Sequence, residues 1–146
     1  MTKSTMSRGG RGFTRASFVA LTLGALIASA VFADSKSSEV RLRTDLAGGA
    51  ISGRVPSGHA DFRSESDRNR SRLNVEVEDV NLADGTVLDV MVSHGGASTK
   101  VGVIHLQAGR GELELNTQDG DTVPAIVKSD AVTVSNAGSP ILMGVF

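Results

Sequence analysis

The chain has 146 residues and contains no cysteine, tryptophan or tyrosine. The length allows one domain once any targeting segment is removed. Disulfide bonds are excluded, so a small exported domain of this sequence must be held together by packing alone. The 15 basic and 16 acidic residues give a formal net charge of −1, which excludes a strongly basic protein.

Residues 1–33 have the organisation of a secretory signal peptide. A basic start without acidic residues comes first, and the apolar segment 16–33, rich in small residues, follows it. The segment ends in small or compact residues, which predicts cleavage between Ala33 and Asp34, with cleavage after Ala30 as an alternative. An uncleaved membrane anchor is a second alternative, because about 18 apolar residues is near the lower limit for a membrane span.

Cleavage would leave a soluble domain in the periplasm or outside the cell, with no stable membrane insertion. All four charges of the leader are basic, so 11 basic residues face 16 acidic ones in the remainder, a net charge of −5. That charge favours solubility and disfavours tight binding to polyanions.

After a polar lead-in at residues 34–39, apolar residues recur mainly with the two-residue period of β-strands. No segment shows a convincing helical period. The alternation predicts nine candidate strands, at residues 40–46, 58–63, 72–78, 86–92, 101–107, 111–117, 123–128, 131–135 and 140–146. Pairs such as Gly95-Gly96 and Asp119-Gly120 mark the turns between them. We expect one all-β domain over residues 40–146, a single antiparallel β-sandwich of seven to nine short strands with immunoglobulin-like or superoxide-dismutase-like Greek-key topology.

The stretch LNVEVEDVNLADGTVLDV, residues 73–90, carries five carboxylates. Its apolar residues change phase after Glu78, which predicts a bend at Glu78-Asp79. The Asp84-Gly85 pair then predicts a hairpin turn, with a more buried strand returning. The same-face neighbours of the acids are polar, so a solvated strand face is favoured over an acid/base pair or a calcium site.

Two groups of arginines accompany these acids. We hypothesise that Arg41 and Arg43 lie opposite one of the two acidic rows, which are formed by Glu76 with Glu78 and by Glu112 with Glu114. Residues 63–72 contain four further arginines interleaved with acids. A solvated hairpin loop is favoured there over a nucleic-acid or polyanion contact, because no aromatic residue is near enough to stack on a base.

His59, His94 and His105 are the only histidines and the only candidate metal ligands. None has the close spacing of a copper or zinc site within one element, so a site would require all three to converge. We expect His94 to be exposed in a turn and His105 to be an ordinary strand residue. No nucleophile motif or phosphate-binding loop occurs, so neither catalytic residues nor cofactors are predicted.

Several motifs together resemble the chordin-type CHRD domain of bacterial exported and animal extracellular proteins. The resemblance spans most of residues 40–146 and includes VRLRTDLAG, the GHADF strand and the central LNVEVEDVNL. It implies an immunoglobulin-like or superoxide-dismutase-like sandwich. The H-x-H motif common in that family is absent here, because His94 and His105 lie apart, so a metal role does not carry over.

These observations favour an exported, non-catalytic module that binds or scaffolds an unknown protein or envelope component, and they do not indicate nucleic acid. One alternative is a dismutase-like copper or zinc enzyme or metal carrier that uses His59, His94 and His105. Another is a structural module that associates with itself through its edge strands.

Overall fold

Eight antiparallel strands and two single-turn 3₁₀ helices make up residues 38–146, the part of the chain that the computed structural model describes. The strands are β1 (Glu39–Ala47), β2 (Ser57–Glu65), β3 (Arg70–Glu78), β4 (Val87–His94), β5 (Ala97–His105), β6 (Gly111–Asn116), β7 (Ala131–Asn136) and β8 (Ser139–Val145), and the helices are η1 (Ser66–Arg68) and η2 (Thr117–Asp119). The predicted all-β class and strand number are confirmed. The predicted signal peptide and its cleavage point between Ala33 and Asp34 lie outside the described residues. Within them, no helix has the length and apolar character needed to cross a membrane.

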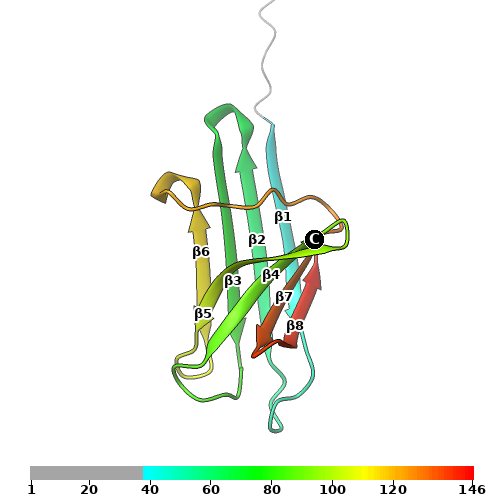
Figure 1. Ribbon diagram of the computed structural model, residues 1–146, viewed down its shortest axis with the longest axis vertical. Helices are drawn as coiled ribbons and strands as arrows, with labels where there is room; N and C mark the ends of the chain where they lie inside the picture. Colours follow the sequence, from blue (N-terminus) through cyan, green and yellow to red (C-terminus); the bar gives the residue numbers. More distant parts are fainter. Residues whose placement is uncertain (1–37) are drawn as a thin grey trace, which may run out of the picture. The chain divides into compact units, whose positions relative to one another are not determined.

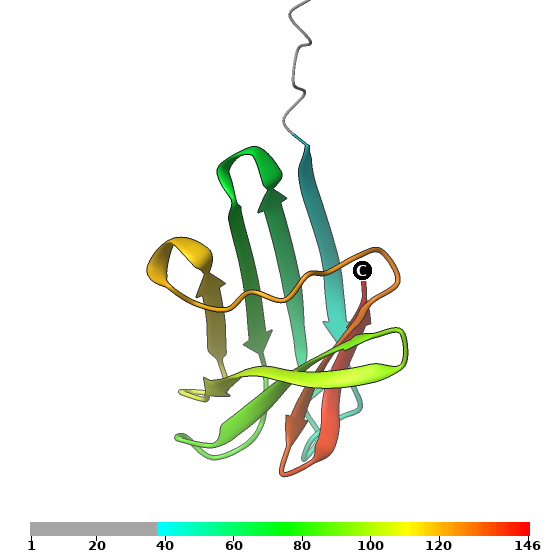
Figure 2. The same ribbon diagram turned by 45° about the horizontal axis from the view of Figure 1, so that its top comes forward.

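All eight strands belong to one sheet with the order β5-β4-β7-β8-β1-β2-β3-β6. The sheet curls into two facing layers, with β1, β2, β3 and β6 behind and β4, β5, β7 and β8 crossing in front of them (Figures 1 and 2). Its two end strands, β5 and β6, follow one another in the sequence and come close together, so the sheet is nearly closed, like a barrel.

The core between the layers is built from the apolar residues of the strand alternation. Each strand sends every second side chain inward, and the residues between them face solvent. The fully buried side chains come from both layers and include Leu46, Leu73, Val75, Val77, Leu88, Val90, Ile104, Val132, Val134 and Leu142. The segment 86–92, predicted to be the more buried strand, alternates like the others, because Asp89 of β4 is partly exposed between the buried Leu88 and Val90.

Glycines form the seam where β1 meets β8, one of the two places where the layers join. The ladder between these strands consists of the single pair Ala47 and Met143. A Cβ on Gly48 would lie 1.7 Å from the carbonyl oxygen of Ile141, and a Cβ on Gly144 would lie 2.5 Å from that of Asp45. Only glycine therefore allows the two backbones to approach so closely at this corner.

The second seam joins β5 and β6. Within residues 38–146 these strands are connected by a tight turn and the isolated bridge between Gln107 and Arg110, rather than by a ladder. A Cβ on Gly102 would lie 2.7 Å from the side chain of Leu113, and one on Gly111 would lie 2.3 Å from Cγ2 of Ile104. The free edges of the sheet thus lie beside each other, and each shields its neighbour from other chains.

The stretch 73–90 is not the predicted hairpin. The bend is confirmed, because Asp79 has the left-handed φ of 56° and ends β3. Beyond it the chain crosses to the other layer, where β4 pairs with β5 and β7 and not with β3. The crossing segment is held to the β5–β6 turn by hydrogen bonds from the amide of Val80 to Gly109 O (3.0 Å) and from the amide of Gly85 to Leu106 O (2.8 Å).

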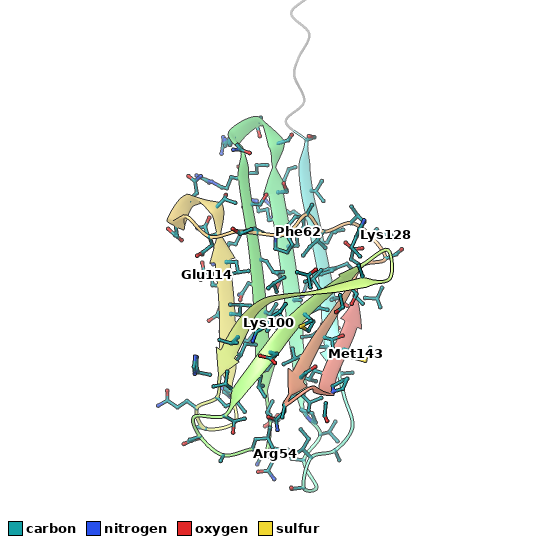
Figure 3. All side chains as sticks on the ribbon, in the orientation of Figure 1. Arg54, Phe62, Lys100, Glu114, Lys128 and Met143 are labelled. Atoms are coloured by element: carbon teal, nitrogen blue, oxygen red, sulfur yellow. The ribbon has the colours of Figure 1, made fainter. Side chains whose placement is uncertain are left out.

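Residues 121–130 form an irregular strap where a strand at 123–128 was predicted. The strap passes in front of β1, β2 and β3, past the part of these strands that β4 and β5 cover (Figure 2). Phe62 lies behind the strap (Figure 3). Its apolar residues Val123 and Ile126 pack against the core. The strand prediction was wrong because this segment has no ladder partner. Its apolar side chains cover the end of the core without forming part of a sheet.

Candidate functional site

Three arginines occupy directly opposite positions on three neighbouring strands. In the ladders, Arg41 of β1 pairs with Arg63 of β2, and Arg63 pairs with Arg72 of β3. We call these residues the arginine row. They lie on the outer face of the back layer, opposite in phase to the buried residues of the same strands. Asn116 of β6 stands opposite Arg72 and continues the line to the fourth strand.

Carboxylates hold the row in place from both sides. Arg41 and Arg63 both bind Glu39, at 2.6 and 2.5 Å, and Arg63 also binds the buried Glu65 at 2.6 Å. Arg72 binds Glu114 of β6 at 2.8 Å. The hydrogen bond from Arg41 lowers the pKa of the Glu39 carboxyl, and the charges of Arg41 and Arg63 lower that pKa further, against the opposing effect of burial. Glu39 therefore stays ionised as the bridge between two arginines.

The arginine side chains remain open to solvent despite these ion pairs. Their exposed fractions are 67% for Arg41, 49% for Arg63 and 52% for Arg72. A guanidinium group has five N–H donors, and each of these arginines directs only one or two atoms to its carboxylates. The remaining N–H donors can bind a ligand. The ion pairs restrict the orientations of the side chains that carry these donors.

Two depressions meet at the row. The first, of about 400 Å³, lies over β1, β2 and β3 and is lined by Arg41, Arg43, Asp61, Arg63, Arg72 and Asn74, among others. The second, of about 360 Å³, is lined by Arg63, Glu65, Arg70, Arg72, Asn116 and Gln118. They share Arg63 and Arg72, so together they form one groove across the strands, which we call the arginine groove.

Asn74 contributes an unsatisfied polar atom to this groove. Its side-chain oxygen Oδ1 is buried and has no hydrogen-bond partner among the described residues. A buried acceptor without a donor typically costs about 1–3 kcal/mol. A donor from a ligand would satisfy this acceptor if the Asn74 side chain turned towards the groove.

Below the arginine groove, the same face is acidic. The next positions along the strands place Asp45, His59, Glu76 and Glu112 in one cross-strand row. Nε2 of His59 lies 3.4 Å from a carboxylate oxygen of both Asp61 and Glu76. The face is thus divided into a basic part near Arg63 and an acidic part near Glu76.

The three histidines do not form a metal site. No group of three or more His, Cys, Asp or Glu side chains within residues 38–146 is arranged to hold a metal ion. His59 lies on the outer face of β2, His94 at the end of β4 and His105 at the end of β5. His105 is exposed although its sequence neighbours are apolar, because the alternation of β5 turns it outward.

His94 instead joins three segments of the chain through Asp130. Its Nδ1 lies 2.8 Å from Oδ1 of the buried Asp130, whose Oδ2 accepts a hydrogen bond from the amide of Val127. The backbone oxygen of Asp130 accepts a bond from Phe146. The Val127 amide lowers the pKa of Asp130, burial opposes this shift, and His94 adds to the lowering. This arrangement fastens the β4–β5 hairpin to the strap and to β8.

Two interpretations of the arginines were wrong. Arg41 and Arg43 pair with Glu39 and Asp61, not with the acidic rows, because β2 separates β1 from β3 and β6. Residues 63–72 are not one solvated loop. They form the ends of β2 and β3 around a short turn, so Arg63 and Arg72 lie on strands.

The arginine row was missed because it depends on strand register. Each member carries a local signal, an arginine at an outward position of an alternating strand, as Arg41 does in VRLRTDL. No pattern within the separate segments indicates that Arg41, Arg63 and Arg72 occupy opposite positions in the paired strands.

Comparisons with known proteins do not assign the chain to a family. No protein-family model matches the chain, no curated protein matches it significantly, and no solved structure does so.

Proposed function

We propose that the protein is an exported, non-catalytic binding module that holds an anionic group of an envelope or extracellular component in the arginine groove. One observation carries the proposal: the side-by-side placement of Arg41, Arg63 and Arg72 on adjacent strands. Like charges directly opposite one another destabilise a sheet. A role in folding alone therefore accounts poorly for this row, whereas an anionic ligand would relieve the repulsion.

The chemistry of the groove suits carboxylate, phosphate or sulfate groups. The planar guanidinium fork matches these anions with two parallel hydrogen bonds, and arginine stays charged at any physiological pH. The ion pairs with Glu39, Glu65 and Glu114 restrict the side chains before a ligand arrives, which reduces the entropy lost on binding. They also offset much of the positive charge, so we expect moderate affinity that decreases with salt.

We further propose that the fold is a Greek-key sandwich of the immunoglobulin-like or superoxide-dismutase-like kind. The strand order supports this topology, because β3 and β4 follow one another in the chain but do not pair: β3 lies between β2 and β6, and β4 lies between β5 and β7. Such sandwiches commonly present one polar sheet face to solvent, which is where the arginine groove lies. The signal peptide predicted at residues 1–33 is the basis for placing this face outside the cytoplasm.

The test is titration of the purified ¹⁵N-labelled protein with citrate and with inorganic phosphate, followed by NMR. We expect shifts of the resonances of β1, β2 and β3 around the arginine row, and none with glucose. The double variant Arg41→Gln/Arg72→Gln should weaken binding at least fivefold. Arg63 is kept in this variant because it neutralises the buried Glu65.

Lys100→Gln is the matched control, because it also removes a cation that is paired with a carboxylate. Lys100 lies on β5 in the other layer and binds Asp89 at 2.6 Å (Figure 3). The Lys100→Gln variant should bind citrate as the unmodified protein does. If neither anion shifts the resonances of β1 to β3, or if the double variant binds as well as the control, the proposal is wrong.

A further inference from the structure

From the shape and chemistry of the arginine groove, we infer that its ligand is a linear acidic polysaccharide that lies across the strands, from β1 towards β6. This inference rests on the proposed function and names the class of ligand. It depends on three features of the groove: its direction, its mixture of arginines with amides, and the acidic row beside it.

The direction follows from the ladders. The line Arg41, Arg63, Arg72 and Asn116 contains one residue from each of four neighbouring strands. Neighbouring strands lie about 4.8 Å apart, so the line spans about 14 Å. A single carboxylate or phosphate would occupy one position along it. A chain with anionic groups at regular intervals can contact several arginines at once.

The amide of Asn74 indicates a ligand that also carries hydroxyl groups. Asn116 and Gln118 line the groove too, but the Asn116 side chain bonds to Gln118 N and Asp119, and Gln118 Oε1 accepts from Arg70. The buried Oδ1 of Asn74 needs a hydrogen-bond donor. An ionised carboxylate or phosphate cannot donate, whereas a sugar hydroxyl can.

The acidic row fixes how the ligand lies. The acidic row of Asp45, Glu76 and Glu112 lies two outward positions from the arginine row, and it would repel an anionic chain that ran along the strands. Across the strands, the same chain stays within the basic part of the face. A polyanion is therefore confined to the groove even though the whole domain is acidic.

Nucleic acid fits this groove less well than a sugar acid does. Proteins that bind single strands stack bases on aromatic side chains. Within residues 38–146 the aromatic residues are Phe62, which is buried in the core, and Phe146 at the end of the chain. Phe62 is among the residues that line the first depression, but its side chain is buried, so the groove offers no exposed aromatic platform. The Asn74 amide, in contrast, is suited to a sugar hydroxyl.

The test measures affinity by calorimetry for galacturonate, digalacturonate, trigalacturonate and pentagalacturonate, with maltopentaose as the neutral control. We expect affinity to rise at least tenfold from the monomer to the trimer, with little gain beyond the length of the groove. Added salt should weaken binding of the trimer, and maltopentaose should not bind.

Asn74→Val separates the sugar contact from the charge contact. It should weaken trigalacturonate binding at least threefold while inorganic tripolyphosphate binds as before, and Lys100→Gln should change neither. If citrate and phosphate bind at the arginines but affinity does not rise with uronate length, the polysaccharide inference is wrong and the proposed function stands. If tripolyphosphate or a short oligonucleotide binds more tightly than trigalacturonate, the inference is also wrong. If no anion binds, both proposals are wrong.

Discussion

Two adjacent glycines, Gly48 and Gly49, offer a sharp test of the β1–β8 seam. A Cβ on Gly48 would be 1.7 Å from the backbone oxygen of Ile141, whereas a Cβ on Gly49 would have no atom within 4 Å. Neither glycine has a left-handed φ, so alanine is compatible with the backbone conformation at both positions. The two substitutions are therefore chemically identical and differ only in what the added methyl group contacts.

Gly48→Ala should destabilise the protein by about 3 kcal/mol or more. The contact is with backbone, which cannot turn away as a side chain can, so the strands must separate. Overpacking alone typically costs about 1–3 kcal/mol, and the neighbouring ladder pair of Ala47 and Met143 adds about 1 kcal/mol for each hydrogen bond lost. Gly49→Ala should be neutral or stabilise the fold by about 0.4–1 kcal/mol, because it restricts the unfolded chain.

The assay is urea and thermal unfolding followed by far-ultraviolet circular dichroism. Tryptophan fluorescence gives no signal in this protein, which has neither tryptophan nor tyrosine. For a domain of about 110 residues, 3 kcal/mol corresponds to a decrease in Tm of roughly 12 °C. If Gly48→Ala and Gly49→Ala unfold within about 2 °C of each other, the close approach of β1 and β8 is not as described.

Substitutions at Asp79, Leu142 and Asp130 test three separate features of the fold. Asp79→Val should cost about 1–2 kcal/mol, because a β-branched residue is strained at a φ of 56°, while Asp79→Gly should stay within about 0.5 kcal/mol in the same urea assay. Leu142→Ala should cost about 2–5 kcal/mol for loss of a fully buried side chain, whereas truncating its exposed neighbour in Met143→Ala should have little effect on Tm. Asp130 has a lower pKa in the folded than in the unfolded state. Its contribution to stability is therefore complete above about pH 4, near the pKa of the unfolded state, and is lost as the pH falls through the pKa of the folded state. In melts between pH 6 and pH 2, Asp130→Asn should therefore start from a lower Tm and lose less of it on acidification; parallel curves would contradict this reasoning.

Local features of the fold could be predicted from the sequence because each depends on a few adjacent residues. Strand alternation places Val75 and Val77 inside, and the change of phase after Glu78 locates the bend at Asp79, whose φ is 56°. The Gly95-Gly96 turn between β4 and β5 follows from the left-handed φ values that glycine tolerates. These predictions require no knowledge of which strands pair.

Strand pairing could not be predicted in the same way. The Asp84-Gly85 turn is a local hairpin signal, but its neighbouring strands lie in different layers because the left-handed turn at Asp79 directs the chain across the end of the core. Besides β2, β3 pairs with β6, more than 30 residues away, and that distant pairing also brings Arg72 beside Asn116. The candidate site thus depends on the register between β1, β2 and β3, and its arginines could be recognised as a group only in the folded sheet.

The seam between β5 and β6 has a consequence for solubility. Each of these strands has one edge without a ladder partner within the described sheet, and the two edges shield one another through the close contacts of Gly102 and Gly111. A side chain added at either glycine would push the two edges apart and expose both to other copies of the chain. We therefore expect Gly102→Val to cause precipitation during concentration, even when dilute samples retain their β-sheet spectrum.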